Sequence, residues 1–164
     1  MTSEALAETS TRRYGIYRLS ETDRPEFLRH LLALDRDGRR WRFGVAVSDG
    51  IIENLAKTLP LEPLSVGLII WGELKGCAQV IRQGTSADAE LAVSLGSDMR
   101  GRGWGAILVD QALALAQAKR VRRVDIQYLS GNTAMHRIAR SYPGTSSSDC
   151  GEISRQVQLD LCDF

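Results

Sequence analysis

A single glutamate and a glycine-rich segment ten residues further on are the parts of this 164-residue sequence best suited to chemistry. Glu90 lies within residues 89–95, where large apolar side chains alternate with small or polar ones at the two-residue period of a β-strand. The glycine-rich segment, residues 100–106, reads Arg-Gly-Arg-Gly-Trp-Gly-Ala. Glycines allow a backbone to curl closely around an anion, and a helix that begins there directs unpaired N–H groups and its positive dipole end at that anion. The pattern therefore predicts a phosphate-binding loop with a carboxylate base beside it.

The elements around these features are predicted from hydrophobic periodicity and from the positions of glycine and proline. Apolar residues of 107–115 recur at helical spacing, so a helix should begin at the glycine-rich segment. Two apolar runs separated by residues 72–76 predict a hairpin that leads into the strand of Glu90. In chain order, the predicted elements are a strand at 13–19, a helix at 20–34, a charged loop at 35–44, a helix at 49–58, strands at 64–71, 77–82 and 89–95, the helix after the glycines, a strand at 124–128, a helix from 132 to about 140, a loop at 145–149 and a strand at 154–161.

Length and composition fit one folded domain, expected at residues 13–164 after a flexible tail at residues 1–12. The 21 basic and 20 acidic residues nearly balance, so no dedicated nucleic-acid surface is expected. Three cysteines and two histidines show no metal-ligand spacing, and the odd cysteine count gives no disulfide framework. No stretch approaches the roughly 18 apolar residues of a membrane span, and residues 1–13 lack a signal-peptide core. The sequence therefore predicts a cytoplasmic protein with no metal and with neither nucleic-acid nor membrane partners.

The order of the predicted elements, with Arg100-x-x-Gly103-x-Gly105 at its centre, resembles that of the GNAT acetyltransferase superfamily. The resemblance covers nearly the whole chain, from residue 13 to residue 161. It implies an α/β (α+β) GNAT fold, with a central, mostly antiparallel, mixed and twisted sheet of about six to seven strands flanked by about four helices. It also implies acetyl-CoA as cosubstrate and N-acetyltransferase activity.

Within the superfamily, Glu90 and the sequence Asn132-x-x-Met135 are similar to the bacterial protein lysine acetyltransferases of the Pat type. In that group the corresponding glutamate serves as the general base, which implies the same role for Glu90 and a protein lysine as acceptor. The resemblance also implies that amides near Val93 and Leu95 pair with the pantetheine arm, that Asn132 contacts this arm, and that the glycine-rich loop holds the pyrophosphate. The predicted cofactor-binding residues are Val93, Leu95, Arg100, Gly101, Arg102, Gly103, Trp104, Gly105, Ala106, Asn132 and Met135.

The expected chemistry follows from two pKa values. A lysine-like amine, with a pKa of about 10.4, must lose a proton before it attacks a thioester, and Glu90 is predicted to remove that proton directly or through one water. A backbone N–H near Val93, freed by a local opening of the sheet, would polarise the thioester carbonyl. Many GNAT enzymes place a tyrosine acid where this chain has Ala139, so the acid is unassigned. Tyr128 and Tyr142 are possible substitutes, and a thiol with a pKa of about 8.5 leaves readily without an acid.

Several alternatives stay open in the sequence. Residues 101–106 also satisfy a dinucleotide-binding fingerprint with Asp125 about twenty residues on, although the antiparallel strands upstream and the short remainder of the chain disfavour that fold. Glu90 would have a structural role if it paired with Arg82, and the protein would be a non-catalytic acyl-CoA-binding module if it only held the cofactor. The acceptor could also be a small-molecule amine, because the charged segment 35–43 carries both signs. Monomer and homodimer are both compatible with the sequence, the latter through pairing of an exposed last strand.

Overall fold

A computed structural model describes residues 14–160, and the predicted tail at residues 1–12 lies outside that range. The described residues build one seven-stranded sheet with the strand order β1-β2-β3-β4-β5-β7-β6. Every neighbouring pair of strands is antiparallel except β4 and β5, which run parallel, so the expected mixed, mostly antiparallel sheet is confirmed. The strands are β1 (Tyr14–Arg18), β2 (Ser65–Ile70), β3 (Glu73–Arg82), β4 (Asp88–Leu95), β5 (Arg123–Leu129), β6 (Gly144–Asp149) and β7 (Glu152–Gln158).

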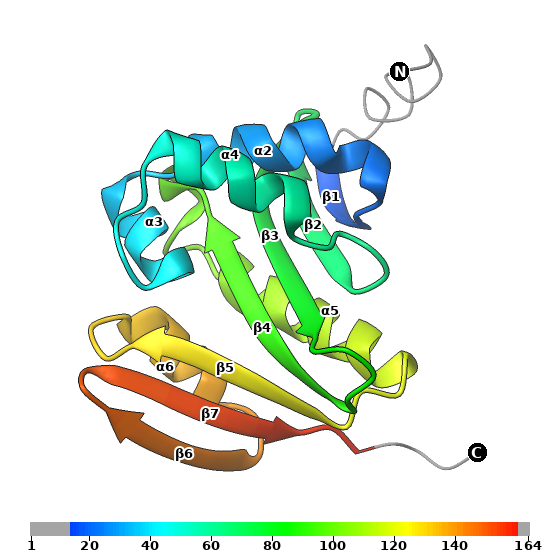
Figure 1. The fold of residues 1–164 in the computed structure, drawn as a ribbon, viewed down its shortest axis with the longest axis vertical. Coiled ribbons are helices and arrows are strands. Elements are labelled where there is room, and N and C mark those ends of the chain that lie inside the picture. Colours follow the sequence, from blue (N-terminus) through cyan, green and yellow to red (C-terminus); the bar gives the residue numbers. More distant parts are fainter. Residues whose placement is uncertain (1–13, 161–164) are drawn as a thin grey trace.

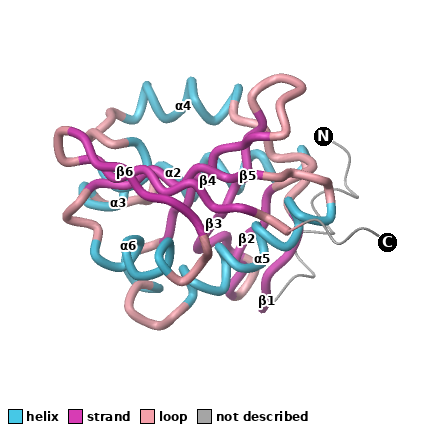
Figure 2. Tube along the Cα trace, turned by 90° about the horizontal axis from the view of Figure 1, so that it is seen from below, coloured by secondary structure: helices cyan, strands magenta, loops and turns pink. Residues whose placement is uncertain are grey.

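Helices cover both faces of the sheet (Figure 1). Figure 2 shows α4 on one side of the strands, and α5 and α6 on the other. No helix within residues 14–160 is long and apolar enough to cross a membrane. The α-helices are α2 (Arg24–Leu32), α3 (Arg36–Phe43), α4 (Asp49–Thr58), α5 (Trp104–Ala118) and α6 (Thr133–Arg140), and two short 3₁₀ helices are η1 (Glu21–Asp23) and η2 (Ser97–Met99).

Each face of the sheet buries its own apolar cluster, because successive side chains of a strand point to opposite faces. On one face, Phe27 and Leu31 of α2 pack with Cys77 of β3. On the other face, Leu108 of α5 packs into a cluster that contains Ala78, the next residue of β3. The two clusters hold the helical layers in fixed positions on either side of β3 and β4.

Helix α3 occupies the segment that the sequence analysis predicted to be a charged loop. The Asp35 carboxylate caps its start by accepting a hydrogen bond from the Gly38 amide at 2.8 Å, and Gly44 ends it in the left-handed region with φ 78°. The helix carries arginines at four of its eight positions, and they hide the apolar periodicity that identifies a helix. The prediction of a loop was therefore wrong, and residues 14–160 hold five α-helices, one more than expected.

Strand β6 was likewise predicted to be a loop. It pairs with β7 in a hairpin whose turn, Cys150 and Gly151, has positive φ values of 46° and 85°. All six β6 residues are exposed, so the strand lacks the apolar alternation that signals a sheet. Because β7 lies between β5 and β6, the last strand is not an edge strand, and the expectation that it could pair across a dimer is wrong.

The sheet opens between β4 and β5. Their parallel pairing runs only as far as Leu91 opposite Ile126, although β4 continues to Leu95 and β5 to Leu129. Figure 1 shows the two strands diverging from that point, with α3 beside the far end of β4 and α6 beside β5. On its other edge, β4 stays paired with β3 up to Leu95 opposite Gly76. One edge of β4 is therefore open where the sequence analysis expected the cofactor.

Candidate functional site

A cleft of about 500 Å³ lies at this opening of the sheet. Its walls come from α3, the end of β4, the loop before α5, the first turn of α5, and α6, so both helical layers contribute. Among the predicted cofactor residues, those that line it are Val93, Leu95, Arg100, Gly101, Gly103, Gly105, Ala106, Asn132 and Met135. Residues that were not predicted to bind the cofactor also line it: Gly38, Trp41, Ser94, Ala134, Arg137 and Ile138.

Two of the predicted cofactor residues, Arg102 and Trp104, do not line this cleft. Arg102 is exposed. Trp104 packs against the apolar cluster of the α5 face, and its ring meets that of Tyr14 edge to face, with the centroids 6.1 Å apart. Trp104 thus anchors the start of α5 to the rest of the fold, and cofactor contact by these two residues stays a prediction.

The loop that enters α5 has the geometry of an anion cradle. Gly101 and Gly103 have φ values of 70° and 85°, a region that residues with a side chain rarely adopt. Gly103 is the N-cap of α5, so no side chain satisfies the first N–H groups of the helix, and the first turn holds no acidic residue. Gly105 and Ala106 bring this helix end to the wall of the cleft. Free N–H groups and a positive dipole end favour a phosphate at that point.

The open edge of β4 supplies further backbone donors. The Gly96 amide donates to the Lys75 carbonyl of β3 at 2.8 Å. Because the N–H groups of successive strand residues point to alternate edges, those of Leu95 and Val93 point toward β5, where the sheet is open. The Leu95 carbonyl faces the same way, since it accepts a hydrogen bond from Arg100 at 3.4 Å. The cleft therefore has an unpaired strand edge along which an extended amide-bearing ligand can add.

Arg100 ties the glycine-rich loop to α3. Its guanidinium donates two hydrogen bonds to the Asp35 carboxylate, at 2.7 and 3.0 Å, and lies 4.9 Å from the centre of the Trp41 ring. These hydrogen bonds, together with that from Gly38, hold the pKa of Asp35 below its usual value. Arg100 was predicted to bind the cofactor, and in the structure its guanidinium is paired with Asp35 at the start of α3.

Close packing explains why Gly38 lies at this contact. A Cβ atom on Gly38 would be 2.6 Å from Nη2 of Arg100 and 2.9 Å from Oδ1 of Asp35. Any side chain at position 38 would therefore displace the ion pair that closes the cleft on the α3 side. The sequence signal for the hydrogen bond between Gly38 and Asp35 is the spacing Asp35-x-x-Gly38, with an aspartate at the N-cap of a helix.

Asn132 caps α6 and lines the cleft at the same time. Its Oδ1 accepts a hydrogen bond from the Met135 amide at 3.1 Å, and the residue is buried. The cap uses the side-chain oxygen and leaves the amide NH₂ group without a partner among residues 14–160. The structural role and the predicted contact with the cofactor are therefore compatible.

Glu90 lies on the face of β4 that α2 and α3 cover, in the same row as Ser94. Its half-buried carboxylate forms no hydrogen bond or ion pair with any residue in the range 14–160. The alternative partner, Arg82, instead donates to the Lys119 carbonyl. The charge of Glu90 acts on Arg42 of α3. Burial lowers the pKa of Arg42, and Cys77 and then Glu90 oppose that effect. Glu90 does not line the cleft itself, and lies three residues before Val93 at its wall.

A buried histidine supports the wall next to Glu90. Nε2 of His30 and Oγ of Ser94 are 2.8 Å apart, and both residues are buried. Burial lowers the pKa of His30 to about 4, with a further lowering by Arg42 and Lys75, while the Leu74 backbone and Asp98 oppose the shift. His30 is therefore neutral at pH 7 and positions the Ser94 hydroxyl in the cleft.

This buried histidine predicts an acid-sensitive stability. The folded-state pKa of about 4 lies below the unfolded value of 6.5, so the unfolded chain binds the extra proton first as the pH falls. The free energy of unfolding should therefore fall by about 3 kcal/mol more in the wild type than in His30→Gln between pH 7.5 and pH 4. Urea unfolding of both proteins at both pH values measures the difference. An equal loss of unfolding free energy in the wild type and in His30→Gln would contradict the burial of a neutral His30.

The two tyrosines considered as general acids lie elsewhere. The Tyr128 hydroxyl shares a 3.0 Å hydrogen bond with Nδ1 of His136, and the Tyr142 hydroxyl donates to Asp110 at 3.5 Å. Burial and then the Asp110 charge raise the pKa of Tyr142 to about 12. Neither tyrosine lines the cleft, and Ala139 is buried. Among residues 14–160, no group of three or more His, Cys, Asp or Glu side chains gathers as a metal site would require.

Solved structures of known proteins share this architecture. The GNAT domain of PAT from S. lividans has a TM-score of 0.73 and 16% identity, over 89% of this chain and 90% of that chain. A ribosomal-protein-alanine N-acetyltransferase from Brucella melitensis has a TM-score of 0.62 and 20% identity, over 88% and 99%. The putative acetyltransferase yncA from Salmonella typhimurium, solved with its cofactor acetyl-CoA, has a TM-score of 0.64 and 15% identity, over 90% and 95%.

No protein-family model and no curated protein sequence matches the chain. The structural likeness nevertheless extends over almost all of the described residues and over nearly the full length of the matched proteins. The chain therefore has the GNAT fold.

Proposed function

We propose that this protein transfers an acetyl group from acetyl-CoA directly to a primary amine. The observation that carries the proposal is the course of the cleft, which runs from the uncapped start of α5 to the open edge of β4. Glu90 lies on the same strand, three residues before Val93. A similar structure that holds acetyl-CoA supports the same cofactor here. The Gly101–Gly103 loop would receive the pyrophosphate, and the strand edge would receive the pantetheine arm.

Each end of the cleft would have its own part in the chemistry. The N–H groups of Val93 and Leu95 would pair with pantetheine amides and place the thioester against β4. One of these N–H groups, near Val93, would stabilise the negative charge that forms on the thioester oxygen during attack. Asn132, held by its helix-capping bond, would offer its NH₂ group to the same arm. The cofactor is thus fixed at several backbone atoms before any acceptor arrives.

Glu90 is the proposed general base. The acceptor amine is protonated at neutral pH, and the carboxylate would take one proton from it, directly or through one water. The amine nitrogen then forms a bond to the acetyl carbon, the carbon–sulfur bond breaks, and the electron pair leaves with coenzyme A as a thiolate. The second proton on the nitrogen passes to water, which leaves the neutral amide. A thiol with a pKa of about 8.5 can leave in this form, so the reaction needs no tyrosine in place of Ala139.

A lysine side chain of a protein is the proposed acceptor class. The similarity to the S. lividans PAT domain supports it, and so does the exposed side of α3 at the rim of the cleft. Of the charges on α3 and its cap, Asp35 is bound to Arg100, Arg39 to Asp49 and to the Leu32 carbonyl, and Arg42 to Gln79. The exposed charges of Arg36, Asp37 and Arg40 are left to meet an acceptor. A long flexible amine on a protein surface can approach such an open rim.

A release assay with a panel of amines tests the proposal. The protein is incubated with acetyl-CoA and either lysine-containing peptides, spermidine, an aminoglycoside or free amino acids, and free thiol is followed with a colorimetric reagent. Thiol release that depends on lysine peptides is the expected result. Release with the small amines alone would replace the protein acceptor by a small-molecule one, and acetyl-CoA binding without release under any condition would support a non-catalytic module.

A further inference from the structure

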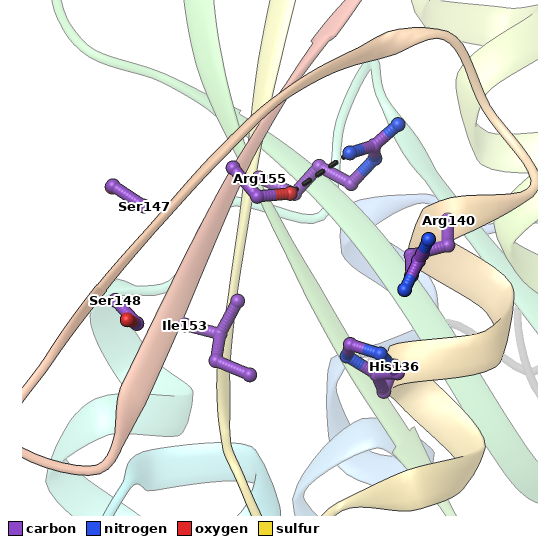
Figure 3. Close-up of a pocket in the computed structure, with 7 residues that line it drawn as sticks. His136, Arg140, Ser147, Ser148, Ile153 and Arg155 are labelled. Carbon is purple, nitrogen blue, oxygen red and sulfur yellow. Dashed lines mark hydrogen bonds between the residues drawn. The ribbon is translucent and has the colours of Figure 1, made fainter.

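A second pocket, of about 380 Å³, lies between α6 and the β6–β7 hairpin and shares no lining residue with the cleft. His136 and Arg140 line it from α6, residues 146–148 from β6, and Ile153 and Arg155 from β7. Figure 3 shows the side chains of His136 and Arg140 on the side of α6 that faces the hairpin. Positions four residues apart lie on one side of a helix, which is why these two meet at the same pocket.

The strand register gathers polar groups on the face that α6 covers. Arg155 pairs with Ser146, and Ile153 is opposite Tyr128 on its other side, so these residues share one face of the sheet. The Tyr128 hydroxyl bonds His136, as described above. Burial raises the pKa of Tyr128, and the positive charges of Arg155 and then Arg140 oppose that rise.

The pocket carries positive charge that no acid balances. None of its lining residues is acidic. Arg140 is exposed and has no hydrogen bond or ion pair with any residue in the range 14–160. Arg155 donates to Ser146 Oγ at 2.8 Å and to the Tyr142 carbonyl at 2.7 Å, while its Nε is buried without an acceptor among the described residues. Buried donors and paired guanidinium groups of this kind favour a bound anion.

We propose that this pocket binds the phosphoryl group of a small phosphomonoester. The donors of the pocket come from two guanidinium groups, an imidazole and serine hydroxyls, and they outnumber what the two oxygens of a carboxylate can accept. A phosphoryl group offers three oxygens and about two negative charges. The volume leaves room for the organic part of the ester beside Ile153. The site lies on the opposite side of α6 from Met135 and Ile138, which line the cleft, so the same short helix borders both ligands.

Ring resonances of histidine test the proposal directly, because the chain has only two histidines and His30 is buried on the other face of the sheet. Inorganic phosphate and glycerol 3-phosphate are titrated separately at fixed pH and ionic strength, and the signal of His136 is assigned from its loss in His136→Gln. A saturable shift of that signal in the millimolar range is expected, with the ester binding at least as tightly as free phosphate. Arg140→Gln and Arg155→Gln should each weaken binding at least about tenfold.

Controls separate this site from general charge effects and from the cleft. Arg122→Gln removes an exposed arginine at the opposite end of β5 and should bind phosphate as the wild type does. The shift should persist in the presence of saturating acetyl-CoA. Because Arg155 has structural hydrogen bonds, the exposed Arg140 provides the variant that is expected to fold normally. Any of four results would overturn the proposal. Two concern the wild-type signal: an equal shift with chloride or acetate, or a shift that acetyl-CoA abolishes. The others are a response to free phosphate but not to the ester, and unchanged binding in Arg140→Gln.

Discussion

Replacement of Glu90 by glutamine is expected to lower kcat for acetyl transfer by about 10² to 10⁴-fold, with little change in acetyl-CoA affinity. Glutamine matches the size of glutamate and keeps the packing of this half-buried position, yet it cannot accept the amine proton. The carboxylate forms no hydrogen bond or ion pair within residues 14–160, so the substitution breaks none that would destabilise the sheet. Steady-state rates of thiol release, with cofactor affinity measured separately by calorimetry, give the two quantities.

A pH series and a neighbouring acid make the Glu90 test specific. Without a base, the rate of Glu90→Gln should rise about tenfold per pH unit below the acceptor pKa of about 10.4, as more free amine becomes available. Asp88→Asn is the matched control, because Asp88 lies on the same face of β4, is paired with Arg123 at 2.7 Å and should not affect turnover. Wild-type turnover in Glu90→Gln would exclude the residue as the base.

Introduction of glutamate at Gly103 is expected to weaken acetyl-CoA binding by at least about 100-fold. Gly103 has φ 85°, which costs a residue with a side chain about 1–2 kcal/mol, and the new carboxylate would lie at the helix end that receives the pyrophosphate. Repulsion between the two anions, together with displacement of the loop, accounts for the larger part of the loss. Calorimetric titration with acetyl-CoA measures it.

Gly84→Glu separates this local effect from backbone strain. Gly84 also has a positive φ, 62°, and open space around it, but it lies in the loop that joins β3 to β4 and does not line the cleft. Both variants should lose similar free energy of unfolding, whereas only Gly103→Glu should lose cofactor affinity. Retained affinity in Gly103→Glu, in a protein that remains folded, would refute the assignment of the loop.

Elements with a clear hydrophobic period could be predicted from the sequence. The helix at 49–58 was predicted with the bounds of α4, and the strand of Glu90 was predicted because large and small side chains alternate there. The hairpin was predicted from its two apolar runs, although β3 begins at Glu73, inside the segment 72–76 that was expected to join the strands. Helix α3 and strand β6 were missed for the converse reason. Arginines dominate α3 and serines dominate β6, and tertiary contacts and caps, rather than an apolar stripe, hold these segments in place.

The contacts that shape the candidate site join residues far apart in the chain. The ion pair between Asp35 and Arg100 spans 65 positions, and the contact between His30 and Ser94 spans 64. Local periodicity contains no information about such pairs. The glycine-rich loop and Asn132 were accessible to sequence reasoning because their geometry depends on short-range requirements, namely positive φ and a helix cap.

Transfer of a labelled acetyl group in a single turnover tests the central claim most directly. The full-length protein, in excess over deuterium-labelled acetyl-CoA, is mixed with a lysine peptide, and the peptide is analysed by mass spectrometry while thiol release is followed. The account predicts one labelled acetyl group on the lysine amine for each thiol released. Release of thiol without acetylated amine, or no transfer to any amine by protein shown to bind acetyl-CoA, would contradict it.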